Sequence, residues 1–358
     1  MLWKQEAKMK RCPSVRRHVS QLAWAGVLLL ALSFLDQASS QTTGPTSLKF
    51  RQSFIPSEQY IPELVAIEKG MYAAQGLTVE MLRSTGGGNA ATLVAAGNDQ
   101  LGVAGAADVL IAGGKGLDIV AVAINSPEDP TAIISLDKNP IRSVTELRGK
   151  RIGAIAGSTA FALLQALLKS NKLSESDVKI VLIGAGDLIS SVISQQVDGI
   201  AAFETTNVPA MRAAGANPVS LRFADVGLRV PGNVYIANGQ FARTNPDVVA
   251  RFLVGTIRGW DEVSRHGYDE GLALLLKTYP ELVKQRDMLA QRWEFRVENK
   301  YNPYSPGKPL TVDAFKFEPR SIETLSSALV SAGLVPSGMS LQMLFSNNFI
   351  DQAQKLMK

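Results

Sequence analysis

The hydrophobic and polar positions of residues 48–82 switch between strand and helix periodicity. Leu48 to Phe54 alternates apolar and polar side chains and predicts a first strand. Apolar residues then recur every three or four positions from Ile61 to Met71, and Pro62 suits the first turn of a helix. Gly76 suits the end of that helix, and residues 77–82 alternate again. The pattern predicts strand, helix and strand.

A glycine-rich turn, Ser84 to Asn89, opens the next predicted helix. Backbone N–H groups there lie near the positive end of a helix, so the turn could hold a polar ligand atom. A plain tight turn is the alternative that the pattern leaves open. The helix ends at Gly97-Asn98, and the strand Leu101 to Ala104 runs into a loop of small residues that ends at Asp108.

The middle of the chain begins with a continuous apolar run, residues 117–124, which is typical of a strand buried on both faces. Two prolines and two acids in residues 125–130 exclude helix and central strand, and predict a crossing between domains. A second apolar strand, residues 151–156, leads to Gly157-Ser158-Thr159 at the start of a helix. Ser158 and Thr159 either cap this helix only, or cap it and contact a ligand.

The order of elements in the first part is repeated about 100 residues later, which is the mark of an internal duplication. Residues 179–183 predict a strand, 184–186 a glycine turn, 187–197 a helix, and 200–203 a strand that ends at Glu204. The duplication predicts an α/β protein of two lobes, each a mostly parallel sheet flanked by helices. Ligands in open α/β sheets bind beyond the carboxyl ends of the strands, so the two lobes would share one cleft.

The last third of the chain predicts one more strand, Val230 to Ala237, and a series of helices that buttress the first lobe. Trp260, Trp293 and Phe295 are expected in the core. The helices are predicted at 245–260, 271–277, 281–293, 321–331 and 341–356. We therefore assign residues 41–126 and 234–358 to lobe I and residues 127–233 to lobe II, with hinges near 125–127 and 230–235.

The N-terminus has the three parts of a secretory signal peptide. Basic residues precede the apolar run Leu22 to Leu35, and the small residues Ala38-Ser39-Ser40 follow it. We predict that residues 1–40 direct the protein to the periplasm and are removed. An uncleaved membrane anchor is the alternative, although 14 apolar residues fall short of the roughly 20 that span a bilayer.

Removing residues 1–40 changes the charge and the chemistry of the chain. Residues 1–40 hold six of the 37 basic and two of the 32 acidic side chains. The remaining chain has 31 basic and 30 acidic side chains, so its net charge is +1. The charge gives no argument for nucleic-acid binding. Cys12 leaves as well, and His266 is the histidine that stays, so a thiol nucleophile and a Cys-based metal site are excluded. Gly114-Lys115-Gly116 lacks the hydroxyl residue of a phosphate-binding loop, and no cofactor is predicted.

Four segments resemble one family of binding proteins. Residues 68–80, EKGMYAAQGLTVE, resemble the EKGxFxxxGLxVE segment of the solute-binding proteins of ABC transporters in the sulfonate/nitrate/taurine and NMT1/THI5-like group. Residues 146–153 resemble the DLKGKxIG segment that opens the second lobe in that group. Residues 197–201 and 245–249 resemble its GxVDAxx and xPxxVxxFxxA segments.

The resemblance implies a class II periplasmic binding protein that closes on a small molecule and delivers it to an ABC permease driven by a separate ATPase subunit. We expect a monomer that is not an enzyme and holds no metal. By position, the resemblance implies a pocket built from Phe54, Gln59, Tyr60, Ser84, Thr85, Gly86, Ala106, Asp108, Asn125, Ser158, Thr159, Ala160, Glu204 and Thr205.

The identity of the ligand stays open at this point. A sulfonate or nitrate would use the helix start at Ser158 and the turn at Gly86, whereas a carboxylate at Glu204 would repel an anion. In the thiamine-pyrimidine branch, a pocket acid can accept hydrogen bonds from a heterocyclic amine while Tyr60 stacks. Glu204 on the outer surface is the alternative. A ligand sensor for a receptor, and a THI5-like pyrimidine-synthesising enzyme, are the other functions to weigh.

Overall fold

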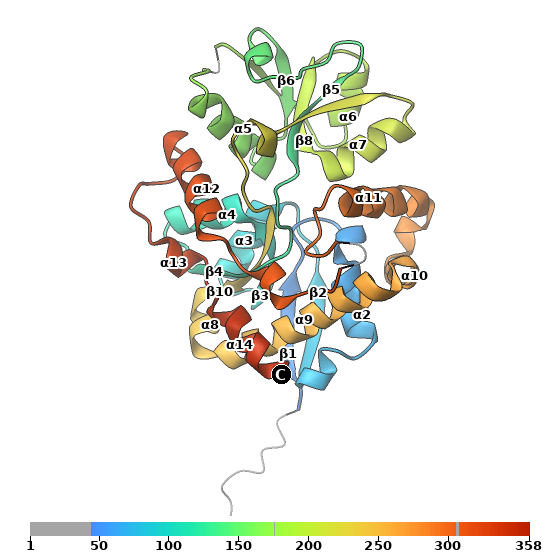
Figure 1. Cartoon of the computed structure of the whole chain (residues 1–358), viewed down its shortest axis with the longest axis vertical. Helices are drawn as coiled ribbons and strands as arrows, with labels where there is room; N and C mark the ends of the chain where they lie inside the picture. The colour runs from blue at the N-terminus through green and yellow to red at the C-terminus, as the bar shows by residue number, and fades with distance from the viewer. Residues whose placement is uncertain (1–43, 175, 306–307) are drawn as a thin grey trace, which may run out of the picture. The chain divides into compact units, whose positions relative to one another are not determined.

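The computed structural model describes residues 44–358, apart from 175 and 306–307. The predicted signal peptide, residues 1–40, lies outside the described residues. Pro45–Lys358 form one unit that contains two mixed sheets, and Figure 1 shows one sheet above the other. The predicted two-lobed α/β fold is therefore confirmed.

The sheet of the first lobe has the strand order β2-β1-β3-β10-β4 within the described residues. Its strands are β1 (Thr46–Arg51), β2 (Leu77–Leu82), β3 (Leu101–Gly105), β4 (Ile119–Ile124) and β10 (Asn233–Asn238). The sheet of the second lobe has the order β7-β6-β8-β5-β9. Its strands are β5 (Thr131–Leu136), β6 (Arg151–Ala154), β7 (Lys179–Leu182), β8 (Gly199–Phe203) and β9 (Pro218–Arg222).

Each sheet is parallel apart from one strand. In the first lobe β10 runs antiparallel to its neighbours β3 and β4, and in the second lobe β5 runs antiparallel to β8 and β9. The chain crosses between the sheets at residues 125–130 and again ahead of β10. The sequence predicts the second hinge at 230–235, but Tyr235 lies inside β10. This crossing therefore ends by Gly232.

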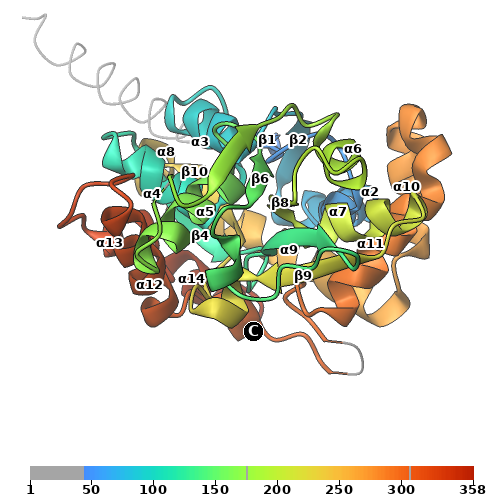
Figure 2. The same ribbon diagram turned by 90° about the horizontal axis from the view of Figure 1, so that it is seen from above.

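The helices cover both faces of the sheets, as Figures 1 and 2 show. They are α2 (Ile61–Glu68), α3 (Gly87–Ala95), α4 (Ala106–Gly114), α5 (Thr159–Ser170), α6 (Leu188–Ile193), α7 (Glu204–Ala213), α8 (Gly239–Thr244), α9 (Pro246–His266), α10 (Asp269–Thr278), α11 (Arg286–Glu298), α12 (Pro319–Ser331), α13 (Leu341–Leu344) and α14 (Asn348–Leu356). Short 3-10 turns are η1 (Glu58–Tyr60), η2 (Ala73–Gln75), η3 (Thr145–Leu147), η4 (Phe223–Val226), η5 (Pro280–Gln285) and η6 (Val312–Phe315).

Several predicted elements differ from those observed: the helix that begins at Ile61 ends at Glu68, and the helix predicted over 281–293 begins at Arg286 after a 3-10 turn. The first strand ends at Arg51, so Phe54 belongs to the loop after it. The predicted loop of small residues after β3 is wrong, because α4 begins at Ala106 directly after the strand. The helix predicted over 341–356 is divided into α13 and α14, because the backbone at Phe345 is extended.

The long helix α9 forms the core of the first lobe together with α2. Trp260 is fully buried, and its ring stacks on Trp293 with ring centroids 6.1 Å apart. Phe295 is also buried, as predicted. At Gly259 the two helices come so close that an added Cβ would overlap the backbone carbonyl of Pro62. Such close contact buries apolar area that favours folding by roughly 25 cal/mol per Å².

The C-terminal helices contact both lobes. The sequence predicts that they buttress the first lobe, and α9, α10 and α14 pack there. In addition, α11 contacts α7, and α12 contacts α5 of the second lobe as well as α4. We call residues 286–331 the C-terminal arm. This arm joins the hydrophobic cores of the two lobes.

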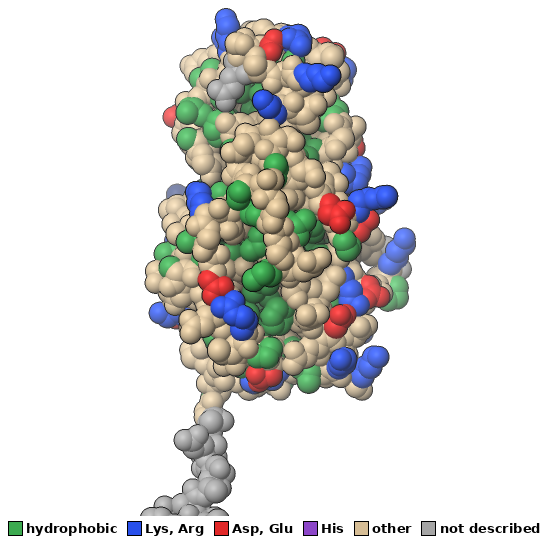
Figure 3. Space-filling view, turned by 90° about the vertical axis from the view of Figure 1, so that its left-hand side faces the viewer, with side chains coloured by type: hydrophobic (Ala, Val, Ile, Leu, Met, Phe, Trp, Pro, Cys, Tyr) green, Lys and Arg blue, Asp and Glu red, His purple; other side chains and the backbone are tan. Residues whose placement is uncertain are grey.

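The surface shows scattered charge on the face that carries α12 and α13. In Figure 3, basic side chains on this face stand singly or near acidic ones, without a broad basic patch. Over residues 44–358, leaving out 175 and 306–307, no helix is both long and apolar enough to cross a membrane.

Candidate functional site

The candidate site lies where the carboxyl ends of the strands in the two lobes meet. Asp108, in the first turn of α4, is its central residue, and its side chain is 5% exposed. Asp108 Oδ2 accepts the backbone N–H of Gly105 (3.1 Å) and the hydroxyl of Thr159 (2.9 Å). Thr159 belongs to the second lobe, so this hydrogen bond crosses between the lobes. Burial raises the pKa of Asp108 to about 6, although both bonds favour the ionised form.

The glycine-rich turn lies against the same carboxylate. Gly87 is the first residue of α3, and a Cβ added to it would overlap Asp108 Oδ2. Ser84 is buried, and its hydroxyl donates toward Gly86 O (3.1 Å) and Asn89 Oδ1 (2.9 Å). Thr85 is exposed. The turn is therefore both a tight turn and the close neighbour of Asp108.

The start of α5 faces this turn from the second lobe. Ser158 is the N-cap, as predicted, and its Oγ accepts the N–H of Phe161 (3.1 Å). Thr159 and Ala160 follow, and both are buried. Two donors at the start of α5 therefore have acceptors within the chain. The N–H of Phe161 donates to Ser158, and the hydroxyl of Thr159 donates to Asp108.

The loop after β1 carries two aromatic side chains and contacts the glycine-rich turn at Ser84. Phe54 is 42% exposed, and its carbonyl accepts the N–H of Ser84 (3.3 Å). Tyr60 is 1% exposed, and its hydroxyl bonds the backbone of Ser53 (2.7 Å). Tyr60 therefore supports the loop from beneath, and Phe54 offers the accessible ring. Gln59 accepts a hydrogen bond from the side chain of Asn233 (3.2 Å).

The first crossing contributes two buried polar residues. Asn125 donates to Tyr235 Oη (3.0 Å), while its Oδ1 has no hydrogen-bond partner among the residues that the structure describes. Asp129 is 6% exposed, and Oδ1 accepts the N–H of Thr131 (2.8 Å). Burial is the main cause that raises the pKa of Asp129 to about 7, and the nearby charge of Asp108 acts in the same direction. Asp129 therefore lies close enough to Asp108 for their charges to interact.

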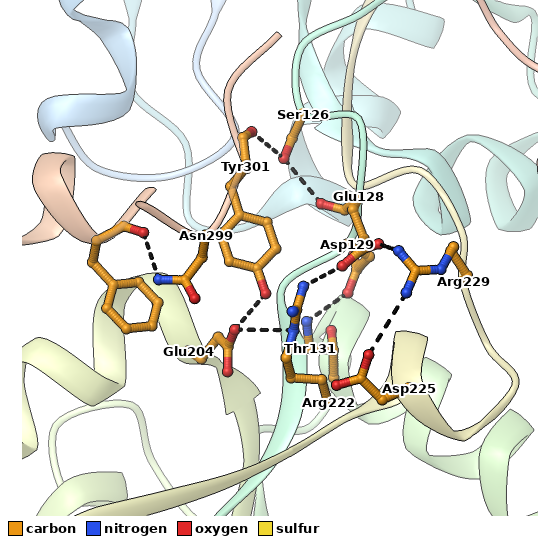
Figure 4. A network of polar contacts seen from close by, with 11 residues as sticks. Ser126, Glu128, Asp129, Thr131, Glu204, Arg222, Asp225, Arg229, Asn299 and Tyr301 are labelled. Carbon is orange, nitrogen blue, oxygen red and sulfur yellow. Dashed lines mark hydrogen bonds and ion pairs between the residues drawn. The ribbon is translucent and has the colours of Figure 1, made fainter. Parts of the chain in front are cut away.

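Glu204 occupies the first turn of α7 and is 2% exposed, so the outer-surface alternative is wrong. Its N–H donates to Pro130 O (2.9 Å), directly after Asp129. Its Oε1 accepts the hydroxyl of Tyr301 and lies 3.3 Å from Arg222 Nε, as Figure 4 shows. Burial raises the pKa of Glu204, although Tyr301 and Arg222 act in the opposite direction. Thr205 is also buried beside it.

Three buried carboxyl groups therefore stand along the junction of the lobes: Asp108, Asp129 and Glu204. The sequence pointed to Asp108 and Glu204, and it showed Asp129 only as part of the crossing. Arg222 and Tyr301 were not predicted. Their partners are far apart in the sequence, so no local pattern indicates them. Ala106 is buried, and its N–H donates to Gly232 O (2.9 Å), so it joins α4 to the second crossing.

A separate cavity of about 800 Å³ lies beside the crossings. Its lining includes Pro127 and Pro231 from the crossings and Lys300 and Arg320 from the C-terminal arm. No residue that was predicted for the site lines this cavity. The ion pairs of Glu128 with Arg222 and Arg229 border it, and Figure 4 shows them.

Comparison with known proteins gives relatives and a fold. A riboflavin-binding protein of Chloroflexus aurantiacus, RibY, is 28% identical over 355 residues, which cover 91% of this chain and 96% of the relative. A formylaminopyrimidine-binding protein of Halalkalibacterium halodurans is 23% identical over 260 residues, which cover 71% of this chain and 78% of the relative. Both relatives are named as binding proteins.

Among solved structures, the periplasmic aliphatic sulphonate binding protein SsuA of Escherichia coli superposes with a TM-score of 0.65 and 18% identity, over 84% of this chain and 91% of SsuA. This likeness shows the periplasmic-binding-protein fold. The family model described as NMT1/THI5 like matches residues 57–267, more than half of the chain. The chain therefore belongs to the NMT1/THI5-like family, as its sequence motifs predicted.

Proposed function

We propose that this protein is the periplasmic solute-binding component of an ABC importer, and that it captures a nitrogen heterocycle without negative charge between its lobes. The observation that carries the proposal is the set of three buried carboxyl groups at the junction, Asp108, Asp129 and Glu204. Carboxylates accept hydrogen bonds, so they suit a ligand that presents N–H or O–H donors.

The same groups disfavour a sulfonate or nitrate. Two unit charges 4 Å apart interact by roughly 4 kcal/mol at an effective dielectric constant of 20, and here the interaction would be repulsive. Helix starts normally attract anions, but acceptors of the chain already take one N–H at each of two helix starts: Asp108 takes the N–H of Gly105, and Ser158 takes that of Phe161. An anion at either helix start would therefore compete with an acceptor of the chain and, at α4, with the charge of Asp108.

The hydroxyl of Thr159 shows what a ligand could replace. This hydroxyl donates to Asp108 across the junction. A heterocyclic N–H or amino group could donate to the same carboxylate when the lobes open and close again. The exposed ring of Phe54, on the loop beside Ser84, would stack on a planar ligand.

The names of two relatives support this class of ligand. One relative is named for riboflavin and the other for formylaminopyrimidine, and both compounds are nitrogen heterocycles. We further propose a transport role without catalysis: closure joins the lobes around the ligand, and a permease with its ATPase subunit receives the closed monomer. His266 gives the proposed site no general base, because it is exposed at the end of α9, where its Nδ1 lies 3.1 Å from Glu262.

A calorimetric titration of the purified protein tests the class of ligand. Riboflavin and an aminopyrimidine would be compared with taurine and nitrate. We expect saturable binding of a heterocycle and none of the anions; at 100 times the dissociation constant the ligand stabilises the protein by about 2.7 kcal/mol in a thermal melt. Binding of taurine or nitrate in place of the heterocycles would contradict the proposal.

Phe54 allows a sharper test. Phe54→Ala should weaken heterocycle binding about tenfold, since stacking on an aromatic ring contributes roughly 1–3 kcal/mol per base. Ile55→Ala is the matched control, because Ile55 is the next residue of the loop and is 54% exposed. It should leave the affinity unchanged. Equal losses in the two variants would show that Phe54 has no special role.

A further inference from the structure

Tyr301 of the C-terminal arm connects three parts of the molecule. It follows α11, and its side chain is fully buried. Its backbone carbonyl accepts the hydroxyl of Ser126 in the first crossing (2.8 Å), and its own hydroxyl donates to Glu204 of the second lobe. Figure 4 shows the ring between these two contacts. One residue thus joins the arm, a crossing and a carboxylate of the candidate site.

The position of Glu204 depends on a small set of neighbours. Tyr301 and Arg222 both contact its Oε1, and the guanidinium of Arg222 lies 5.3 Å from the centre of the Tyr301 ring. Arg222 is in turn paired with Glu128 of the first crossing. Ser220 of β9 and Asp225 of η4 also lie close enough to Glu204 to affect its pKa.

These contacts differ from ordinary core packing because a buried carboxylate needs partners to keep its orientation. Arg222 is 27% exposed and is shared with Glu128, so it holds Glu204 through only part of its guanidinium. The hydroxyl of Tyr301 is not shared in this way, because Glu204 is its one acceptor among the described residues. A hydrogen bond to a charged acceptor is typically twice as strong as a neutral one.

We propose that Tyr301 is the positioning residue for Glu204: it sets the direction of the carboxylate toward a ligand and links that carboxylate to the first crossing through Ser126. The part of this inference that concerns a ligand rests on the proposed function. The part that concerns Glu204 and the crossing rests on the contacts alone. Tyr301 itself touches no ligand in this proposal.

The hydroxyl of Tyr301 affects the pKa of Glu204, which packing of the ring alone would not do. Its hydrogen bond lowers the pKa of Glu204, against the effect of burial, as do Arg222 and Ser220, while Asp225 raises that pKa. Removing the hydroxyl removes one stabilising contact of the ionised form. The midpoint of Glu204 titration must therefore move to higher pH, and a ligand that needs the ionised carboxylate must lose affinity at a correspondingly higher pH.

Tyr301→Phe is the variant to examine, since it keeps the ring and removes only the hydroxyl. Tyr304→Phe is the matched control: Tyr304 lies three residues further along the arm, is 9% exposed and packs on Trp260. The carboxyl carbon of Glu204 would be titrated by NMR in the ligand-free protein. We expect an upward shift of about one pH unit for Tyr301→Phe and none for Tyr304→Phe.

The same variants are then titrated with the heterocycle that the unmodified protein binds. We expect about a tenfold loss for Tyr301→Phe, with the low-pH limit of binding displaced upward, and no loss for Tyr304→Phe. An unchanged Glu204 titration would overturn the inference even if binding persisted. If the unmodified protein bound no heterocycle, the proposed function would fail, while the NMR shift would still decide the positioning role.

A measurement on the unmodified protein guards against a variant that does not fold. A hydroxyl proton that is buried and donated to a carboxylate exchanges slowly and gives an NMR signal far downfield. Such a signal from Tyr301, with a cross-peak to Glu204, supports the inference. A Tyr301 hydroxyl that exchanges with solvent as fast as that of an exposed tyrosine contradicts it.

Discussion

At the scale of single residues, the junction is defined by buried carboxyl groups, and Asp108 makes a pH prediction possible. Its pKa is raised from 3.8 to about 6 by burial, so the folded protein binds the proton more tightly than the unfolded chain. Asp108 therefore favours folding at low pH, and this contribution is lost as the pH rises from 3.8 through 6. The loss amounts to about 3 kcal/mol at 1.36 kcal/mol per pKa unit.

Asp108→Asn should remove this dependence, because the amide carries no charge at either pH. Denaturant unfolding at pH 4 and pH 7 would measure it. We expect the variant to gain stability relative to the unmodified protein between these values, by up to about 3 kcal/mol. The charge of Asp108 helps to raise the pKa of Asp129, so the measured difference contains a smaller contribution from Asp129 with the same sign. Parallel pH curves for the two proteins would show that Asp108 is not buried as described.

At the scale of elements, the start of α3 depends on two adjacent glycines with different surroundings. A Cβ at Gly87 would overlap Asp108 Oδ2, whereas a Cβ at Gly88 would stand 3.8 Å from Oδ1. Gly87→Ala must move α3 or the carboxylate, and we expect a loss of about 1–3 kcal/mol in stability together with weaker ligand binding. Thermal melts and ligand titrations would measure both effects.

Gly88→Ala is the control within the same turn. It should be neutral or stabilising by up to about 1 kcal/mol, because alanine favours a helix over glycine and the space is open. If the two substitutions had the same effect, the contact between Gly87 and Asp108 would not be what requires the glycine.

The same elements show what a sequence pattern can and cannot predict. Periodic segments such as α2, β2 and the long α9 were predicted well, because burial of one face imposes a regular spacing of apolar residues. The start of α4 was missed because small residues carry little periodicity, and Asp108 caps the helix by accepting the N–H of Gly105. Propensity within such a short segment does not separate helix from loop.

The candidate site was only partly predictable for a related reason. Residues that directly follow a predicted strand, such as Asp108 and Glu204, were found, since strand ends converge at one edge of a sheet. Asp129 was hidden within a crossing read only as a hinge. Tyr301 lies 97 residues from Glu204, and Arg222 lies 94 residues from Glu128, so their contacts depend on the folded chain.

At the scale of the whole molecule, the predicted duplication is visible in one repeated ion pair. Arg51 on β1 pairs through Nε with Asp99 (2.8 Å), just before β3, and Arg151 on β6 pairs through Nη2 with Asp198 (2.9 Å), just before β8. In both lobes the arginine bonds both carboxylate oxygens. The two lobes thus connect equivalent strands by the same contact.

Burial separates the two pairs energetically. The side chain of Asp99 is 1% exposed and that of Arg51 is 17% exposed, against 18% and 42% for Asp198 and Arg151. Breaking a buried pair leaves a charge without compensation and typically reduces stability by 3–5 kcal/mol, whereas an exposed pair contributes about 0–1 kcal/mol. We expect Asp99→Ala to destabilise the protein by about 2–3 kcal/mol and Asp198→Ala by about 1 kcal/mol.

A double variant that combines Asp99→Ala and Asp198→Ala tests whether the two ion pairs stabilise the protein independently. The pairs lie in different sheets and share no partner, so their effects on the free energy of unfolding should add to within about 0.5 kcal/mol. Denaturant unfolding of the four proteins measures this sum. A larger effect of Asp198→Ala than of Asp99→Ala would contradict the burial argument. A strongly non-additive double variant would mean that the arm, which packs on both lobes, transmits strain between them.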